Sequence, residues 1–132
     1  MSAKTLFLLL CSGEHEKIQM AAMIASVAAV SERPVQLFVS MNAFLAFRKG
    51  LSDDERYHGG TFSKLMRDKK APDAVGLLGQ GKALGDLSVY ACSMALDVAG
   101  LQISDLVEDL FDGPLGLTKF LSDAESGDLV VL

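Results

Sequence analysis

The chain has 132 residues and a formal net charge of −5, and 50% of its residues are hydrophobic while 22% are charged. This length suits one compact domain spanning residues 1–132, and the composition excludes a disordered chain. The negative charge disfavours a nucleic-acid partner, because such surfaces neutralise phosphates with Lys and Arg. Two cysteines without a CxxC pair are too few for a disulfide scaffold or a zinc site.

The apolar segments of the chain are short. A membrane-spanning helix needs about 20 apolar residues, and no uninterrupted stretch of that length occurs. The first ten residues carry one basic residue and a short apolar run, without the small-residue cleavage site of a signal peptide. We therefore expect a cytoplasmic protein with no membrane span, in which the thiols stay reduced.

The chain opens with a strand and a long helix. Residues 6–10 form a continuous apolar run, which predicts a strand covered on both faces in a parallel sheet. The polar loop 12–15 then opens a helix of about 16 residues, judged by the helical period of its apolar positions. Pro34 ends this region, because proline disfavours helix in the residue before it. The expected buried stripe of the helix consists of Ile18, Ala21, Ala22, Ala25 and Ala28 or Ala29.

A second strand is predicted at 35–39, followed by a short helix that carries the apolar side chains of Phe44, Leu45 and Phe47. The polar, glycine-punctuated interval 48–60 predicts a surface loop. A loop of this length in so small a domain is often functional or mobile, and whether it closes as a lid is left open. Two further helices are expected, at 61–68 and from 72–73 through 78.

The last third of the chain predicts a strand at 87–91 with Cys92 at its carboxyl end, and a helix at 93–99 capped by Gly100. The remaining predicted elements are a short segment at 106–110 capped by Ser104 and Asp105, a helix at 114–124 with Leu117, Phe120 and Leu121 facing inward, and a strand at 128–132. This alternation predicts a single three-layer α/β/α domain with a mainly parallel sheet of about five strands.

Candidate reactive groups follow three of the predicted strands: Cys11, residues 40–42, and Cys92. Reactive groups gather beyond the carboxyl ends of strands in open parallel sheets, so these groups should share one edge. Cys92 has the stronger case because it starts a helix, where the unpaired backbone N–H groups of Ser93 and Met94 would stabilise a thiolate or another anion. The alternative is that Cys92 is a buried small hydrophobe.

Three further residues could assist chemistry at Cys92, and each also has an ordinary structural or surface role as an alternative. If the first and third strands are neighbours, Cys11 could form a disulfide or a two-thiol site with Cys92, although packing is the favoured interpretation. His15 could assist proton transfer to a leaving thiol, and His58 could cover the site if the 48–60 loop closes. For both histidines an exposed surface position is the favoured alternative.

Two weaker signals concern anions. Arg48, Lys49 and Arg56 could hold an anionic sulfur donor, although neighbouring acidic residues dilute their field. The backbone of residues 12–13, between strand and helix, could bind a small anion, but one glycine is weak evidence.

The segment Val89-Tyr90-Ala91-Cys92-Ser93-Met94-Ala95-Leu96-Asp97-Val98-Ala99-Gly100-Leu101 resembles the DsrE/DsrF-like sulfur-relay proteins. In that family a strand delivers a cysteine that is followed by a short helix ending in glycine. The opening strand, the alanine-rich helix and the C-terminal apolar strand continue the likeness over the whole chain. The Cys-Ser-Met segment is its most specific part.

This resemblance implies a sulfur carrier or sulfurtransferase that holds sulfane sulfur as a persulfide on Cys92, with no metal and no organic cofactor. The implied partners are sulfur-donating and sulfur-accepting proteins or low-molecular-weight persulfides, and the implied state is a homo-oligomer, a trimer or a hexamer. Cys11 matches no position of the family pattern. A hypothesis of another class is a non-catalytic assembly or regulatory subunit, suggested by the apolar composition and by Phe44, Leu45 and Phe47.

Overall fold

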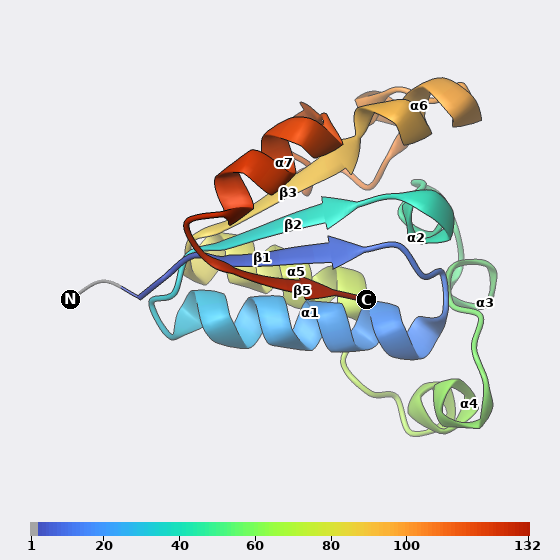
Figure 1. Ribbon diagram of the computed structural model, residues 1–132. Helices are drawn as coiled ribbons and strands as arrows, with labels where there is room; N and C mark the ends of the chain where they lie inside the picture. The colour runs from blue at the N-terminus through green and yellow to red at the C-terminus, as the bar shows by residue number, and fades with distance from the viewer. Residues whose placement is uncertain (1–2) are drawn as a thin grey trace.

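The computed structural model describes residues 3–132, and in it five parallel strands form one sheet in the order β4-β3-β2-β1-β5. Helices α1 (His15–Val30) and α5 (Ala74–Leu84) cover one face, and α7 (Leu117–Ala124) and α6 (Ser93–Ala99) lie on the other (Figure 1). The strands are β1 (Leu6–Leu10), β2 (Val35–Val39), β3 (Leu87–Cys92), β4 (Gly113–Leu115) and β5 (Asp128–Val131). The predicted three-layer α/β/α architecture is confirmed.

The short helices gather at the carboxyl end of the sheet (Figure 1). They are α2 (Met41–Ala46), α3 (Asp53–Arg56), α4 (Thr61–Asp68) and the 3₁₀ turn η1 (Ile103–Asp105). Within residues 3–132 we find no helix with the length and apolar character needed to cross a membrane. The carboxyl edge is therefore surrounded by short, irregular elements, whereas the opposite edge carries simple connections.

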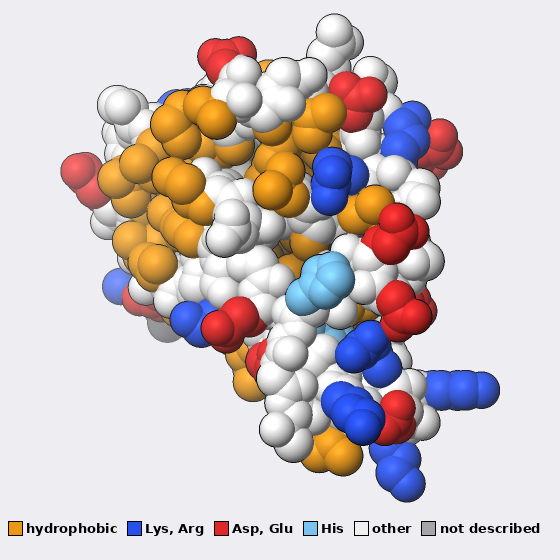
Figure 2. All heavy atoms as spheres, turned by 90° about the vertical axis from the view of Figure 1, so that its right-hand side faces the viewer, with side chains coloured by type: hydrophobic (Ala, Val, Ile, Leu, Met, Phe, Trp, Pro, Cys, Tyr) orange, Lys and Arg blue, Asp and Glu red, His pale blue; other side chains and the backbone are white. Residues whose placement is uncertain are grey.

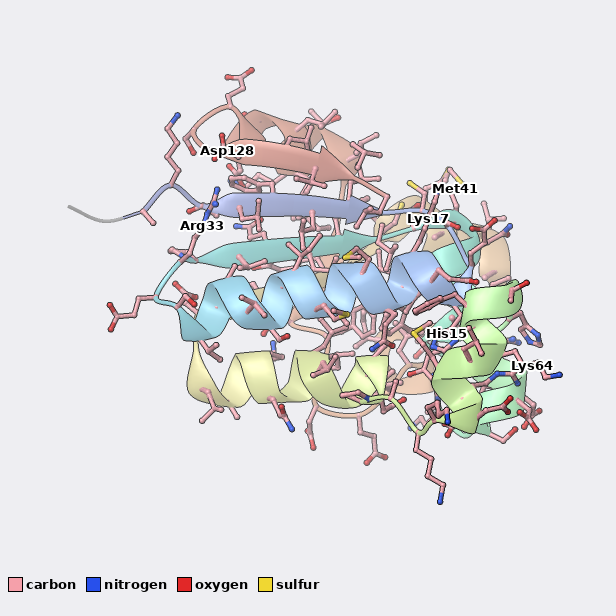
Figure 3. The ribbon with its side chains drawn as sticks, turned by 90° about the horizontal axis from the view of Figure 1, so that it is seen from below. His15, Lys17, Arg33, Met41, Lys64 and Asp128 are labelled. Carbon is pink, nitrogen blue, oxygen red and sulfur yellow. The ribbon has the colours of Figure 1, made fainter. Side chains whose placement is uncertain are left out.

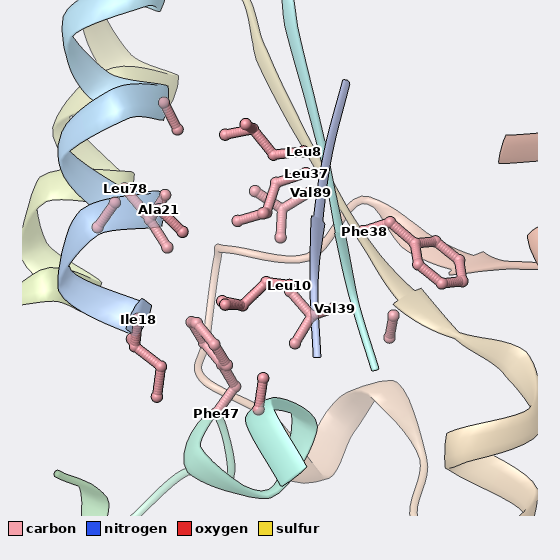
Figure 4. Close-up of a cluster of buried hydrophobic side chains, with 14 of the residues drawn as sticks. Leu8, Leu10, Ile18, Ala21, Leu37, Phe38, Val39, Phe47, Leu78 and Val89 are labelled. Atoms are coloured by element: carbon pink, nitrogen blue, oxygen red, sulfur yellow. The ribbon is translucent and has the colours of Figure 1, made fainter. Parts of the chain in front are cut away.

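Alternation along the strands divides the core into two layers. Leu8, Leu37 and Val89 are register partners across β1, β2 and β3, and they point toward α1 and α5 (Figure 4). One residue later, Phe38 points to the opposite face, where its ring stacks on Phe120 of α7 at a centroid distance of 4.9 Å. Because both faces are covered, these strands are apolar along almost their whole length.

Helices α1 and α5 approach closely because the contact is made by small residues. A Cβ added at Gly81 would lie 3.3 Å from the Cα of Ser26, and one added at Gly85 would overlap the carbonyl oxygen of Ala29. Glycine at position 85 therefore serves close helix contact, since its backbone angles are ordinary for any residue. The buried stripe expected on α1 is confirmed, and of the two alternatives at its end Ala29 is the buried residue.

The sequence-based boundaries differ from the structure in the last third of the chain. The sequence predicts one helix over 114–124, but residues 113–115 pair with β3 as a strand and the helix begins at Leu117. Within α7 Phe120 and Ala124 are buried, while Leu117 and Leu121 are exposed, which corrects the expectation for those two leucines. The segment 106–110 is irregular rather than helical, and the 3₁₀ turn lies before it.

The close packing of α1 and α5 yields a stability prediction. Gly85→Ala forces a backbone shift and should lower the free energy of unfolding by about 1–3 kcal/mol, as overpacking does. Gly79→Ala is the matched control, because nothing lies within 4 Å of its added Cβ and the position is inside a helix. That variant should be stabilised by about 0.5–1 kcal/mol. Urea unfolding of both variants tests the contact, and equal effects would contradict it.

Candidate functional site

Cys11, Ser40 and Cys92 form one row across the carboxyl edge of the sheet. Leu10, Val39 and Ala91 are register partners, and each member of the row is the next residue along its strand. Successive strand residues point to opposite faces, so the row lies on the same face as Phe38, toward α7. Both thiols thus share an edge, as the sequence predicts, with a serine hydroxyl between them.

The first and third strands are not neighbours, because β2 lies between them. The Cα atoms of Cys11 and Cys92 are therefore two strand spacings apart, about 9 to 10 Å. A disulfide needs Cα atoms about 4.4 to 6.8 Å apart. The condition for direct approach of the two sulfurs is not met, and a bond between them would require the backbone to move.

Both thiols line a cavity of about 220 Å³ between the sheet edge, α2, α6 and α7. Cys92 is only 5% exposed and Cys11 is half-buried. The cavity reaches the surface between the side chains of Met41, Met94 and Leu117, which are each about half exposed. Little of the Cys92 surface is therefore exposed to solvent, but the side chain faces a cavity that opens to the outside.

The backbone of Met41 lies in the left-handed region, with φ 52°. This conformation costs an L-residue roughly 1–2 kcal/mol, and such strain clusters at functional sites. Ser40 precedes it as the N-cap of α2, and the amide of Ala43 donates to the carbonyl of Cys11 at 3.1 Å. The tight turn after β2 therefore holds Met41 at the mouth of the cavity.

The two thiols differ in their surroundings. Cys92 is the N-cap residue of α6, and Ser93 and Met94 form the first turn of that helix, as the sequence predicts. Burial raises the pKa of the Cys11 thiol above its ordinary value, and the nearby Cys92 raises it further. Cys11 is consequently held as the neutral thiol near neutral pH.

His15 does not line the cavity of the two thiols. The expectation that this histidine is exposed is wrong, since it is 4% exposed. Its Nδ1 lies 2.7 Å from the Ser63 Oγ of α4, and its ring stacks on Tyr57 at 4.4 Å between centroids. Figure 3 shows His15 against α4, with Met41 at a different part of the edge.

The cluster around His15 attaches α4 to the rest of the domain. The Tyr57 hydroxyl donates to a carboxylate oxygen of Asp73, and the amides of Gly60 and Ser63 donate to Glu16 at 2.9 and 3.1 Å. Burial, followed by the bond to Asp73, raises the pKa of Tyr57. These contacts join α1, α4 and the start of α5, which indicates a structural role.

The 48–60 interval contains α3 and is fixed by side chains. Ser52 and Glu55 form a capping box, and the Arg56 guanidinium donates to the carbonyls of Ala46 and Arg48. Tyr57 is buried, whereas His58 is exposed as the favoured interpretation predicts, and the His58 Nε2–H donates to the Glu55 carbonyl. None of these residues lines the cavity of the two thiols.

A separate cavity of about 530 Å³ lies over the loop after β1. It is lined by residues 12–13, Arg48, Arg56 and His58. Several groups that the sequence suggests for anion binding therefore lie around one cavity. Glu14 and Glu55 line the same space and offset the arginine charge. Lys49 points elsewhere and lies 3.7 Å from Glu108. This cavity includes neither thiol.

No protein-family model matches the chain. The chain is 25% identical to the uncharacterized protein YrkE of Bacillus subtilis (strain 168), with 92% of each chain covered. Its fold is similar to that of MTH1491, a protein of unknown function from Methanobacterium thermoautotrophicum, with a TM-score of 0.64 and 12% identity. It is also similar to the YchN protein of E. coli, with a TM-score of 0.61 and 14% identity. Both alignments cover 98% of this chain and 99% of the other, and they establish a shared fold.

The burial of His15 yields a pH prediction. Desolvation lowers the pKa of His15 below 6.5, while Glu16, Gln19 and Asp73 oppose that shift and Arg67 adds to it. The folded state therefore binds the proton less readily than the unfolded chain, and stability is lost as the pH falls below about 6.5.

Urea unfolding at about pH 7.5 and about pH 5.5 measures this loss, in a window that keeps carboxylates ionised. His15→Gln should reduce the difference between the two conditions, and His58→Gln serves as the exposed control. An unchanged difference in His15→Gln would assign the acid sensitivity to another group.

Proposed function

We propose that this protein is a sulfur carrier or sulfurtransferase that holds sulfane sulfur as a persulfide on Cys92. The single observation that carries the proposal is that Cys92 lines an open cavity at the carboxyl edge of a parallel sheet. The resemblance of residues 89–101 to DsrE/DsrF-like proteins supports it, and the fold shared with YchN is compatible with it.

The chemistry needs only a thiolate and two partners. The Cys92 thiol loses its proton to water, and the thiolate attacks the sulfane sulfur of a donor, forming Cys92–S–S⁻ as the donor's leaving group departs. A thiolate of the acceptor then attacks the outer sulfur, which regenerates the Cys92 thiolate. The free N–H groups in the first turn of α6, at Ser93 and Met94, favour the anionic forms.

The distance between the two thiols implies that the sulfur is released to an external thiol and not to Cys11. Cys11 lies too far from Cys92 to resolve the persulfide by forming a disulfide, and its raised pKa disfavours the nucleophilic thiolate. The acceptor thiol therefore comes from a partner protein or a low-molecular-weight compound. Because this cycle requires a reduced thiol, it belongs to a reducing compartment such as the cytoplasm.

Mass spectrometry of the intact protein tests the carrier role. After incubation with inorganic polysulfide, the wild type should gain the mass of one or more sulfur atoms, and dithiothreitol should remove it. Cys92→Ser should lose the adduct entirely, because no nucleophile remains at that position, while Cys11→Ser should keep it. A wild type that never gains sulfur, or an adduct that survives in Cys92→Ser, would contradict the proposal.

We also propose that the chain self-associates. Figure 2 shows hydrophobic side chains gathered over the upper left of the carboxyl face, whereas Lys and Arg gather in its lower part. The edge strand β5 exposes Leu129 and Val131, and the outer face of α1 exposes an apolar stripe, here Met20, Met23, Val27 and Val30. None of these β5 and α1 side chains lines the Cys92 cavity, and such exposed apolar strips are typical of subunit contacts. By contrast, Phe44 and Phe47 belong to the core, which corrects their suggested role in contacts.

Light scattering tests self-association. We expect a mass that is a multiple of 14.1 kDa, a trimer or a hexamer, and a solution mass of one chain would contradict it. The same measurement on Cys92→Ser addresses the assembly-subunit alternative. Unchanged assembly together with lost sulfur loading favours the carrier role, whereas normal assembly with no sulfur loading in the wild type favours an assembly subunit.

A further inference from the structure

The cavity around Cys92 is apolar and contains no charged side chain among the described residues that line it. Its walls are formed by Leu9, Phe38 and Leu117 and by the thioethers of Met41 and Met94. Apart from the two thiols, its polar side chains are the hydroxyls of Ser40 and Ser93. A bound molecule would therefore meet alkyl, aromatic and sulfur surfaces.

A second hollow of about 310 Å³ continues this surface between α2 and α6. It shares Met41 and Met94 with the Cys92 cavity, and Leu45 and Val98 are among its exposed apolar side chains. Asn42 is its single polar side chain among the described lining residues. The two hollows thus form an apolar path that leads from the surface to the thiol.

An anionic donor has no counter-charge along this path. Moving an ionised group from water into apolar surroundings is strongly unfavourable unless it is paired, and the chain itself carries a net charge of −5. Arg48 and Arg56, which could bind an anion, line the separate cavity that contains neither thiol. The charge distribution therefore disfavours anionic sulfur donors relative to neutral donors, and inorganic polysulfide should load Cys92 slowly rather than fail to load it.

We propose that Cys92 takes its sulfur from neutral, apolar sulfane-sulfur compounds, specifically dialkyl polysulfides, whose alkyl arms occupy the Met41–Met94 groove. This proposal rests on the proposed function and names its substrate class. Burial of each CH₂ group contributes about 0.8 kcal/mol, so short alkyl arms suffice for recognition. Polarisable thioethers beside the sulfur chain add favourable contacts.

The transfer from a dialkyl trisulfide balances without an external oxidant. The Cys92 thiolate attacks the central sulfur of R–S–S–S–R, which forms Cys92–S–S–S–R and releases R–S⁻. The released thiolate then attacks the sulfur that bears R, which forms R–S–S–R and leaves Cys92–S–S⁻. One sulfur atom is transferred, and the proton lost by the Cys92 thiol goes to water.

The experiment compares two trisulfides that differ only in the charge of their arms. Dipropyl trisulfide and the trisulfide of mercaptopropionate have arms of equal length, but the second ends in carboxylates. The full-length protein is incubated with each, and the rate of sulfur gain on Cys92 is followed by intact mass spectrometry. We expect loading from dipropyl trisulfide to be at least about tenfold faster, since an unpaired carboxylate gains nothing from the groove.

A charge placed at the cavity mouth provides the matched test of location. Leu117→Lys adds a cation to a lining residue, and Thr118→Lys adds the same cation to its exposed neighbour outside the cavity. Leu117→Lys should reduce the preference for the propyl donor by about fivefold, the effect of one partly exposed charge pair. Thr118→Lys should leave the preference unchanged.

The outcomes separate this inference from the proposed function. Equal or faster loading from the carboxylate donor, with Cys92 still the loaded residue, would overturn the substrate class and leave the carrier role intact. Equal effects of the two lysine variants would overturn the assignment of the groove. Failure to load from either trisulfide and from inorganic polysulfide would overturn the carrier role itself.

Discussion

The parallel pairing of β1, β2 and β3 is the constraint on which the site depends. Their register makes Leu10, Val39 and Ala91 partners, and the next residue of each strand therefore falls in one row. Because parallel strands end at the same edge, Cys11, Ser40 and Cys92 are brought together although they are far apart in sequence. A shift of one residue in this register would turn a thiol to the other face of the sheet.

The same strand pairing places the two thiols at one edge of the sheet and also sets the distance between them. They face one cavity, but the intervening strand β2 keeps them from bonding directly. Burial holds Cys11 as a thiol, and Cys92 stands at the start of α6 beside free backbone N–H groups. The two cysteines therefore have different surroundings in a shared, apolar space.

Polar interactions are concentrated away from this space. His15, Tyr57 and Asp73 hold α4 and the start of α5 to the domain, and Arg56 fixes the 48–60 interval. The sequence suggests His15 for proton transfer and Arg56 for anion binding, but in the structure both side chains make contacts that hold the fold together. The charged and the apolar halves of the carboxyl face are consequently distinct, as Figure 2 shows.

The sequence by itself determined the strands, the long helices and the edge that carries both cysteines, because apolar runs, helical periods and caps such as Gly100 are local signals. Only the tertiary structure decided the strand order, the three-residue β4, the burial of His15 and the apolar cavity lined by Leu117. Each of these depends on contacts between distant segments. Just before β4, for example, the Asp112 amide donates to the Val89 carbonyl and the Val89 amide donates to the Asp112 carboxylate, and no local pattern of the sequence predicts this pair.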